Sequence, residues 1–289
     1  MVISVISTKG GVGKTTIAAS LGAFCANAGL QVLLIDLDDQ ATLSGYFQLQ
    51  PDHVAAMGIF ELISQNALKN DHISRTIFER LDVIYADERC RNLNTLLLHA
   101  PDGRLRLRNL LPAISSNYDI IIVDTQGARC ITVEMAILAS DMVLSPIMPE
   151  MLAARELQRG LIQIISELAP YHRLGIPVAP LRVLFNRVHA VSTNASLIQQ
   201  AVRKAVEQHA GVSVLETSIP AIEAFQRAST EGIPVHRAET RRPSGRITPS
   251  ALEIVCSLAC EVFTDEEWRA KFCQVTGREP FERQPEGDV

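Results

Sequence analysis

A glycine-rich segment with two lysines follows the first apolar run of the chain. Residues 2–6 are apolar apart from one serine, and residues 17–21 resume an apolar pattern with helical spacing. Between them, glycines allow successive backbone N–H groups to face a phosphate, and the start of a helix adds its positive end. Lys14 is expected to reach the β- and γ-phosphates of a nucleotide, and Thr15 to offer its hydroxyl to Mg²⁺. The predicted contacts to the nucleotide come from Gly10, Gly11, Val12, Gly13, Lys14, Thr15 and Thr16.

The segment departs from the strict phosphate-loop pattern at one position. That pattern places a glycine five residues before Gly13, where this chain has Thr8, and Lys9 adds a second lysine. At average residue frequencies the string from Lys9 to Thr15 would arise by chance in a chain of this length with a probability on the order of 10⁻⁵. We therefore interpret the segment as a nucleotide site rather than an ordinary glycine turn.

Carboxylates end two of the apolar runs at the edge where the phosphates are expected. Asp36 and Asp38 follow residues 32–35, and Asp124 ends residues 119–124. A carboxylate beside Mg²⁺ can hold the metal's waters, and one beside the γ-phosphate can position an attacking water. An aspartate at a strand end can also simply cap the next turn or helix, and this alternative stays open for all three.

Short runs rich in Val and Ile alternate with helical patterns along the chain, which is typical of βα units in a parallel sheet. We expect strands at residues 2–7, 31–36, 82–85, 119–124, 141–146, 181–186 and 212–216. We expect helices at residues 14–28, 131–140, 151–169, 192–209 and 249–263, and further helices beside one strand within 41–117. The predicted fold is α/β, a doubly wound and mostly parallel sheet that binds ligands at the carboxyl ends of its strands.

The composition fits a globular protein in which any basic surface is a local patch. The 289 residues are 47% hydrophobic and 20% charged, which is enough to bury a full core. The formal charge of -5 excludes a uniformly basic protein that coats nucleic acid, but it leaves room for a local basic patch. No apolar run approaches the roughly 18 residues of a spanning helix, and no signal peptide is recognisable, so we expect a cytoplasmic protein. The six cysteines form no Cys-x-x-Cys pair and are interpreted as core thiols.

The string from Lys9 to Thr15 resembles the deviant Walker A motif of the ParA/MinD family of ATPases, most closely that of ParA-type, Soj-like partition proteins. The resemblance implies that Lys9 reaches across a dimer to the partner's nucleotide. It also matches Asp38 with the family's hydrolytic aspartate and Asp36 with the aspartate linked to metal and switch, and the run ending at Asp124 resembles Walker B. The implied catalytic residues are Lys9, Lys14, Asp38 and Asp124, and the implied metal site is formed by Thr15, Asp36 and Asp124.

Three residues in two loops differ from what the family usually has. Asp39 stands where a proline usually follows the hydrolytic aspartate, which adds a negative charge near the phosphates. Gln126 and Gly127 stand where prolines often follow Walker B. Gly127 keeps the backbone free to sense the γ-phosphate. These departures leave the rate of hydrolysis and the switch geometry open.

The resemblance assigns three further nucleotide contacts. Asn186 ends a predicted strand and could offer a donor and an acceptor to an adenine edge. Pro220 resembles the residue that packs on the other side of the base, and Glu150 resembles a glutamate that approaches the opposing subunit's nucleotide. Each could instead be an ordinary loop residue, and Glu150 could simply favour the start of a helix.

Four arginines gather between residues 237 and 246 against one glutamate. Arg237, Arg241, Arg242 and Arg246 lie in a Ser/Gly/Pro-rich stretch, where they could contact a phosphate backbone without reading bases. A solvated loop is the alternative. The family has basic residues in this C-terminal region that bind DNA without sequence preference.

The resemblance covers residues 1–263, which we expect to form the P-loop ATPase domain, followed by a charged and frayed C-terminal tail at 264–289. It implies a partition ATPase that uses ATP and Mg²⁺, forms a homodimer with ATP and binds nonspecific DNA. A ParB-like centromere-binding protein would stimulate hydrolysis and release it, and the protein would be nucleoid-associated. The chief alternative is a MinD-like positioning ATPase on a membrane, which the mixed charges of residues 265–272 disfavour. A metabolic ligase or synthetase is the third reading.

Overall fold

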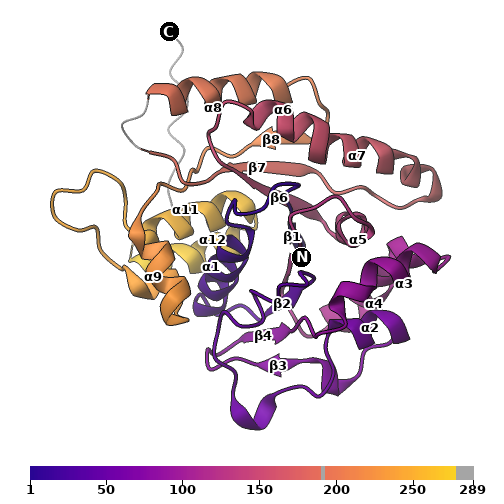
Figure 1. The fold of residues 1–289 in the computed structure, drawn as a ribbon. Coiled ribbons are helices and arrows are strands. Elements are labelled where there is room, and N and C mark those ends of the chain that lie inside the picture. The colour runs from indigo at the N-terminus through magenta and orange to yellow at the C-terminus, as the bar shows by residue number, and fades with distance from the viewer. Residues whose placement is uncertain (190–192, 278–289) are drawn as a thin grey trace.

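The computed structural model describes residues 1–189 and 193–277. An eight-stranded sheet runs through its centre with helices on both faces (Figure 1). The strand order is β3-β4-β2-β5-β1-β6-β7-β8, and within it only β3 and β4 pair antiparallel. This is the doubly wound, mostly parallel architecture predicted from the alternating patterns.

All seven predicted strands are present. The strands are β1 (Val2–Val5), β2 (Val32–Asp36), β3 (Ser74–Arg75), β4 (Leu81–Ile84), β5 (Ile120–Asp124), β6 (Met142–Ile147), β7 (Leu181–Phe185) and β8 (Val212–Val214). The additional strand, β3, has only two residues, which is too short to produce a recognisable alternation of apolar and polar side chains.

The helices between the strands correspond to the predicted βα units, with more of them than predicted in the C-terminal third. The α-helices are α1 (Lys14–Asn27), α2 (Ile59–Gln65), α3 (Leu93–His99), α4 (Arg106–Ser115), α5 (Ile131–Ala139), α6 (Ala153–Leu157), α7 (Gln163–Leu168), α8 (Thr193–Val206), α9 (Glu223–Glu231), α10 (Val235–Ala238), α11 (Ala251–Val262) and α12 (Glu266–Thr276). Short 3₁₀ turns are η1 (Pro51–His53), η2 (Asn70–His72), η3 (Cys90–Asn92), η4 (Gly103–Leu105) and η6 (Ala169–Leu174).

Each face of the sheet builds its own apolar layer. Alternate residues of β2 show the division, because Leu33 and Ile35 pack with helices α2 to α8 while Val32 and Leu34 pack with α1 and α9 to α12. Strands covered on both faces are mostly apolar, and β1, β2 and β5 are buried along their whole length. The sheet is therefore a rigid platform, and its loops carry the polar chemistry.

The predicted helix at 151–169 is interrupted. A π-helical turn, η5 (Gln158–Ile162), separates α6 from α7. From α6 to α7 the segment is therefore helical throughout but is not one continuous α-helix. The π-turn contains Gly160, whose helix propensity is low. Such turns are rare and occur often at functional sites.

The expectation of a frayed tail from residue 264 is wrong over Glu266–Thr276. This stretch forms helix α12, whose first turn is capped by the Asp265 carboxylate accepting from the Trp268 N–H at 3.0 Å. Phe272 is fully buried and its ring lies 5.6 Å from that of Phe24 and 5.7 Å from that of Phe263. The high charge of this segment concealed the few apolar residues that seat it on the core. The ordered fold therefore continues past 263.

A buried histidine on α10 faces α1. His236 is 2% exposed, and its ring meets that of Phe24 edge to face at 5.5 Å. Within the described residues, neither of its ring nitrogens has a hydrogen-bond partner. Burial, with a smaller effect from Arg237, lowers its pKa to about 4, so the folded protein holds this ring neutral at pH 7.

We expect this histidine to make the protein less stable in mild acid. The unfolded chain binds a proton at His236 near pH 6.5, whereas the folded chain does so only near pH 4, so stability falls as the pH drops through that window. The loss should approach about 3 kcal/mol. Urea unfolding at pH 7 and 4.5, compared between the wild type and His236→Phe, isolates this contribution. An equal loss of stability in both proteins would contradict it.

Candidate functional site

The predicted phosphate-loop residues and the predicted metal carboxylates meet at the carboxyl edge of the sheet. The glycine loop follows β1, which lies between β5 and β6 at the centre of the sheet. Asp36 and Asp124 end neighbouring strands and are direct partners in the β2–β5 register. Residues from the ends of β1, β2 and β5 are thus gathered around the start of α1, where Gly13 precedes the first turn with a φ of 92°. This is the edge at which such sheets bind ligands.

Thr15 and Asp124 form a direct contact. The Thr15 hydroxyl donates to the Asp124 carboxylate at 2.6 Å, and the Thr125 N–H donates to its second oxygen at 3.1 Å. Asp124 is fully buried, and burial together with the nearby Asp36 carboxylate raises its pKa to about 7 despite the Thr15 bond. A cation beside this carboxylate would lower that pKa again. A hydroxyl and a carboxylate are hard oxygen donors of the kind Mg²⁺ takes, so the pair fits that metal.

Lys14 completes the centre of this arrangement. Its side chain is 7% exposed in the first turn of α1, and its charge acts on both Asp38 and Asp124 by lowering their pKa values. A buried ammonium beside carboxylates at the head of a glycine loop is the feature that the phosphate-loop pattern requires. The contact of Lys14 with the β- and γ-phosphates stays a prediction.

Asp36 uses both of its oxygens to hold the following loop. One accepts from the Asp38 N–H at 3.0 Å, and the other accepts from the N–H and hydroxyl of Ser44 at 2.8 and 2.6 Å. The Ser44 hydroxyl in turn accepts from the Ala86 N–H at 2.8 Å, which joins this loop to the end of β4. Ser44 was not identified from the sequence, because nothing in the spacing of residues 38–50 marks one serine. The metal role of Asp36 stays a prediction.

Asp38 lies half-buried in the turn between β2 and that loop. Its carboxylate accepts from the Gln40 N–H at 3.0 Å, and burial raises its pKa while the Lys14 charge opposes the rise. The Gln40 bond is the turn-capping contact of the simpler interpretation. Proximity to Lys14 also places the carboxylate beside the phosphate loop, so the hydrolytic role stays a prediction. Asp39, in the usual proline position, is exposed.

The loop after β5 packs against the glycine loop. A Cβ atom at Gly127 would lie 2.9 Å from the Gly10 Cα and 3.0 Å from both the Gly10 N and the Lys9 carbonyl oxygen. These are backbone atoms, which cannot rotate away. A glycine at 127 is therefore needed for the two loops to approach each other this closely.

Asn186 lies beside the glycine loop, and its polar atoms are used within the protein. Its amide nitrogen donates to the Val12 carbonyl at 2.7 Å and its oxygen accepts from the Arg187 N–H at 2.9 Å. A Cβ at Gly13 would overlap that amide. Pro220 is bridged to Val188, two residues beyond Asn186. The two lie near each other at the end of β7, and their contacts with a base stay predictions.

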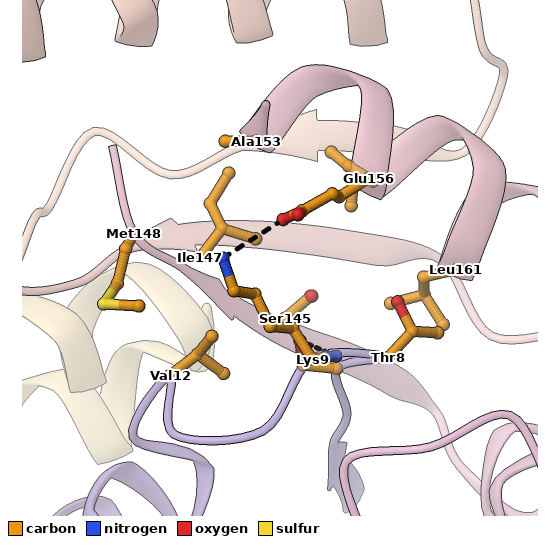
Figure 2. A pocket seen from close by; sticks show the side chains of 11 residues that line it. Thr8, Lys9, Val12, Ser145, Ile147, Met148, Ala153, Glu156 and Leu161 are labelled. Atoms are coloured by element: carbon orange, nitrogen blue, oxygen red, sulfur yellow. Dashed lines mark hydrogen bonds and ion pairs between the residues drawn. The ribbon is translucent and has the colours of Figure 1, made fainter. Parts of the chain in front are cut away.

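Lys9 and Glu150 meet within one chain. The Lys9 ammonium lies 2.6 Å from a Glu150 carboxylate oxygen and 3.4 Å from one of Glu156, and Figure 2 shows it pointing from the loop toward α6. These side chains are 40–50% exposed, and the Glu150 hydrogen bond raises the pKa of Lys9. Exposed ion pairs contribute little to stability, so the lysine can leave them at small cost. Glu156 was not predicted.

The arginines of residues 237–246 differ in how many contacts their side chains make within the protein. Arg246 forms a two-pronged ion pair with Glu239 at 2.5 and 2.9 Å and also donates to the Pro249 carbonyl, which closes the loop on itself. Arg237 donates to Asn27 at 2.8 Å and lies 5.4 Å from the centre of the Phe78 ring. Arg241 and Arg242 are exposed at the tip, with one bond from Arg242 to the Ile247 carbonyl. Two of the four predicted DNA-contacting arginines, Arg237 and Arg246, are thus engaged by other side chains of the protein.

None of the helices among residues 1–189 and 193–277 combines the length and apolar character that crossing a membrane requires.

A family model described as "AAA domain" matches residues 1–174. The sporulation initiation inhibitor protein Soj of Bacillus subtilis is 29% identical over 235 residues, 81% of this chain and 89% of that protein. A ParA family protein of Chlamydia pneumoniae is 33% identical over 183 residues, 61% of this chain and 71% of its own.

Solved structures share the fold at lower identity. McdA of Cyanothece, solved as an ATP complex, superposes with a TM-score of 0.72 at 21% identity and covers 98% of each chain. Cobyrinic acid a,c-diamide synthase of Mycobacterium smegmatis, solved with ADP and magnesium, superposes with a TM-score of 0.67 at 23% identity, covering 86% of this chain and 98% of its own.

Proposed function

The chain belongs to the ParA family of P-loop ATPases, and from this premise we propose that it is a DNA partition ATPase. ATP binding brings two copies together, the homodimer binds DNA without sequence preference, and a ParB-like centromere-binding partner stimulates hydrolysis and so releases the DNA. The observation that carries the proposal is the loop with two lysines, Lys9 and Lys14, set against the Thr15–Asp124 contact. The protein would act in the cytoplasm on the nucleoid.

ATP and Mg²⁺ are the cofactors that this site suits. Lys14 and the backbone of residues 10–16 would hold the phosphates, and Thr15 with Asp124 would hold the metal, which neutralises phosphate charge when bound. Asn186 and Pro220 flank the place for a base. Among proteins of this fold, the synthase structure holds ADP and magnesium, and the McdA structure holds ATP.

Dimer formation is supported by the position of Lys9. The side chain lies on the surface of the loop, while Lys14 occupies the buried centre, so the two lysines serve different sides of the nucleotide. Glu150 and Glu156 hold Lys9 in the single chain. A second subunit's phosphates carry more negative charge and would draw the lysine across.

DNA binding is assigned to the exposed tip of the arginine loop. The Arg246–Glu239 ion pair fixes the base of that loop, so Arg241 and Arg242 project from a closed loop rather than from a flexible segment. Charges farther away than roughly 8 Å are screened at physiological salt, so the net acidity of the protein does not cancel this tip. One chain offers two such charges, and a dimer doubles them.

Replacing Arg241 and Arg242 together with glutamine should weaken DNA binding equally across sequences. The slope of log affinity against log salt should fall by about one for each phosphate contact that is lost. ATP turnover without DNA should be unchanged, because the tip lies away from the phosphate loop. Binding is measured by fluorescence anisotropy with ATP at several salt concentrations. Arg173→Gln, an exposed arginine on η6, is the matched control.

An unaltered salt slope in the double variant would reject the tip as the DNA surface. The next surface to test would then be Arg203 and Lys204 on α8, or Arg155 and Arg159 near α6.

The partition function itself is tested by co-sedimentation with plasmid DNA and with liposomes, each with ATP and with ADP. We expect ATP-dependent sedimentation with DNA only. Sedimentation with liposomes instead would favour a MinD-like positioning ATPase. ATP turnover that needs a small-molecule acceptor, but neither DNA nor liposomes, would favour a ligase like the synthase that shares this fold.

A further inference from the structure

The π-helical turn η5 touches the first residue of the phosphate loop. A Cβ atom built at Gly160 would overlap the Thr8 hydroxyl and would lie 3.1 Å from both the Cβ and the Cγ2 of Thr8. Rotation about χ1 can move the hydroxyl and the methyl group of Thr8, but it leaves the Thr8 Cβ where it is. Any side chain at 160 would therefore require the Thr8 backbone or the π-turn to shift by a few tenths of an ångström.

This contact occupies the position where the loop departs from the strict pattern. The strict pattern has a glycine where this chain has Thr8, so the chain must find room for a branched side chain at the loop's entrance. That room comes from the helix side, through a glycine in a π-turn. Gly160 and Thr8 together thus replace the single glycine of the strict pattern.

The same helical segment also holds Lys9. Glu156 lies one turn before Gly160, and its carboxylate is 3.4 Å from the Lys9 ammonium. Thr8, Lys9, Glu156 and Leu161 line one pocket between the loop and this segment, as Figure 2 shows. One helical segment therefore contacts two successive loop residues. Thr8 packs against Gly160, and Lys9 pairs with the charge of Glu156.

We propose that Gly160 is a positioning residue: it seats Thr8 and thereby sets where Lys9 leaves the loop toward the partner subunit's nucleotide. The proposal rests on the proposed function, because it concerns the lysine that acts between subunits. Lys14, which binds phosphate within the same subunit, lies on α1 beyond this contact. A shift at Thr8 should consequently affect turnover and ATP-dependent dimerisation more than the binding of ATP to one chain.

The test is Gly160→Ala with Thr8→Gly as its rescue. In Gly160→Ala we expect turnover to fall at least tenfold, while the Kd for ATP from calorimetry stays within about threefold of the wild type. The double variant Thr8→Gly/Gly160→Ala should return to within about threefold of Thr8→Gly alone. Gln158→Ala, an exposed side chain in the same π-turn, is the matched control and should behave as wild type.

Wild-type turnover in Gly160→Ala would overturn the proposal. So would a loss that Thr8→Gly does not restore, because the alanine would then act on the helix alone. If Gly160→Ala does not fold, a folded and active double variant supports the contact, and a double variant that also fails to fold rejects it.

Failure of the proposed function gives a different result. The wild-type chain would then fail to sediment with plasmid DNA in ATP. The melting temperatures of the wild type, Gly160→Ala, Thr8→Gly and the double variant would still report whether Thr8 and Gly160 are coupled.

Discussion

Alanine at Lys14 should weaken ATP binding by about 100-fold or more, the largest effect we expect from a single substitution. Lys14 as a residue is 7% exposed at the head of α1, so its bond to phosphate would form largely away from water. A charge-assisted hydrogen bond in such a place is worth roughly 3 kcal/mol, which corresponds to that loss of affinity. Isothermal calorimetry with ATP and Mg²⁺ measures it directly.

Lys204→Ala is the matched control, because it removes the same charge from an exposed position on α8. Its affinity for ATP should equal that of the wild type. Unchanged ATP affinity in Lys14→Ala would refute the assignment of residues 8–16 as a phosphate loop.

The second large effect concerns hydrolysis. Asp38→Ala should leave ATP affinity nearly unchanged and reduce turnover by about 100-fold to 1,000-fold, since a carboxylate that positions the attacking water acts only in the transition state. The ATP-bound dimer should then persist, and size exclusion in ATP would show it. Asp39→Ala tests the exposed neighbour and should keep most of the activity.

A wild-type rate of hydrolysis in Asp38→Ala would leave the Gln40 turn bond as the function of this side chain. Asp36 and Asp39 would then be the next candidates for the catalytic carboxylate.

Residues at strand ends could be predicted from the sequence, and residues placed by long-range packing could not. Asp36, Asp124 and Asn186 each close an apolar run, and parallel strands necessarily bring such ends to one edge. Ser44 and Gly160 act through contacts that cross the fold, and neither lies in a recognisable spacing. Their roles become visible only when the segments are placed in space.

The distribution of charged residues along the sequence was the least reliable predictor of which segments are exposed. Four arginines in one stretch predicted a local basic patch that contacts DNA, but Arg246 pairs with Glu239 and Arg237 donates to Asn27. A count of charges carries no information about which of them pair internally. Likewise, the acidic and basic residues of 265–271 indicated a solvated tail and concealed the burial of Phe272.

The seating of α12 has a practical consequence for imaging this protein in cells. A fluorescent fusion or affinity tag joined at residue 263 would remove Phe272 from its place against Phe24 and leave an aromatic surface bare to water. Exposed aromatic patches promote aggregation, and bright foci in a cell would then mark aggregated protein instead of segregating DNA. Reporters should be joined after Gly277, where α12 ends.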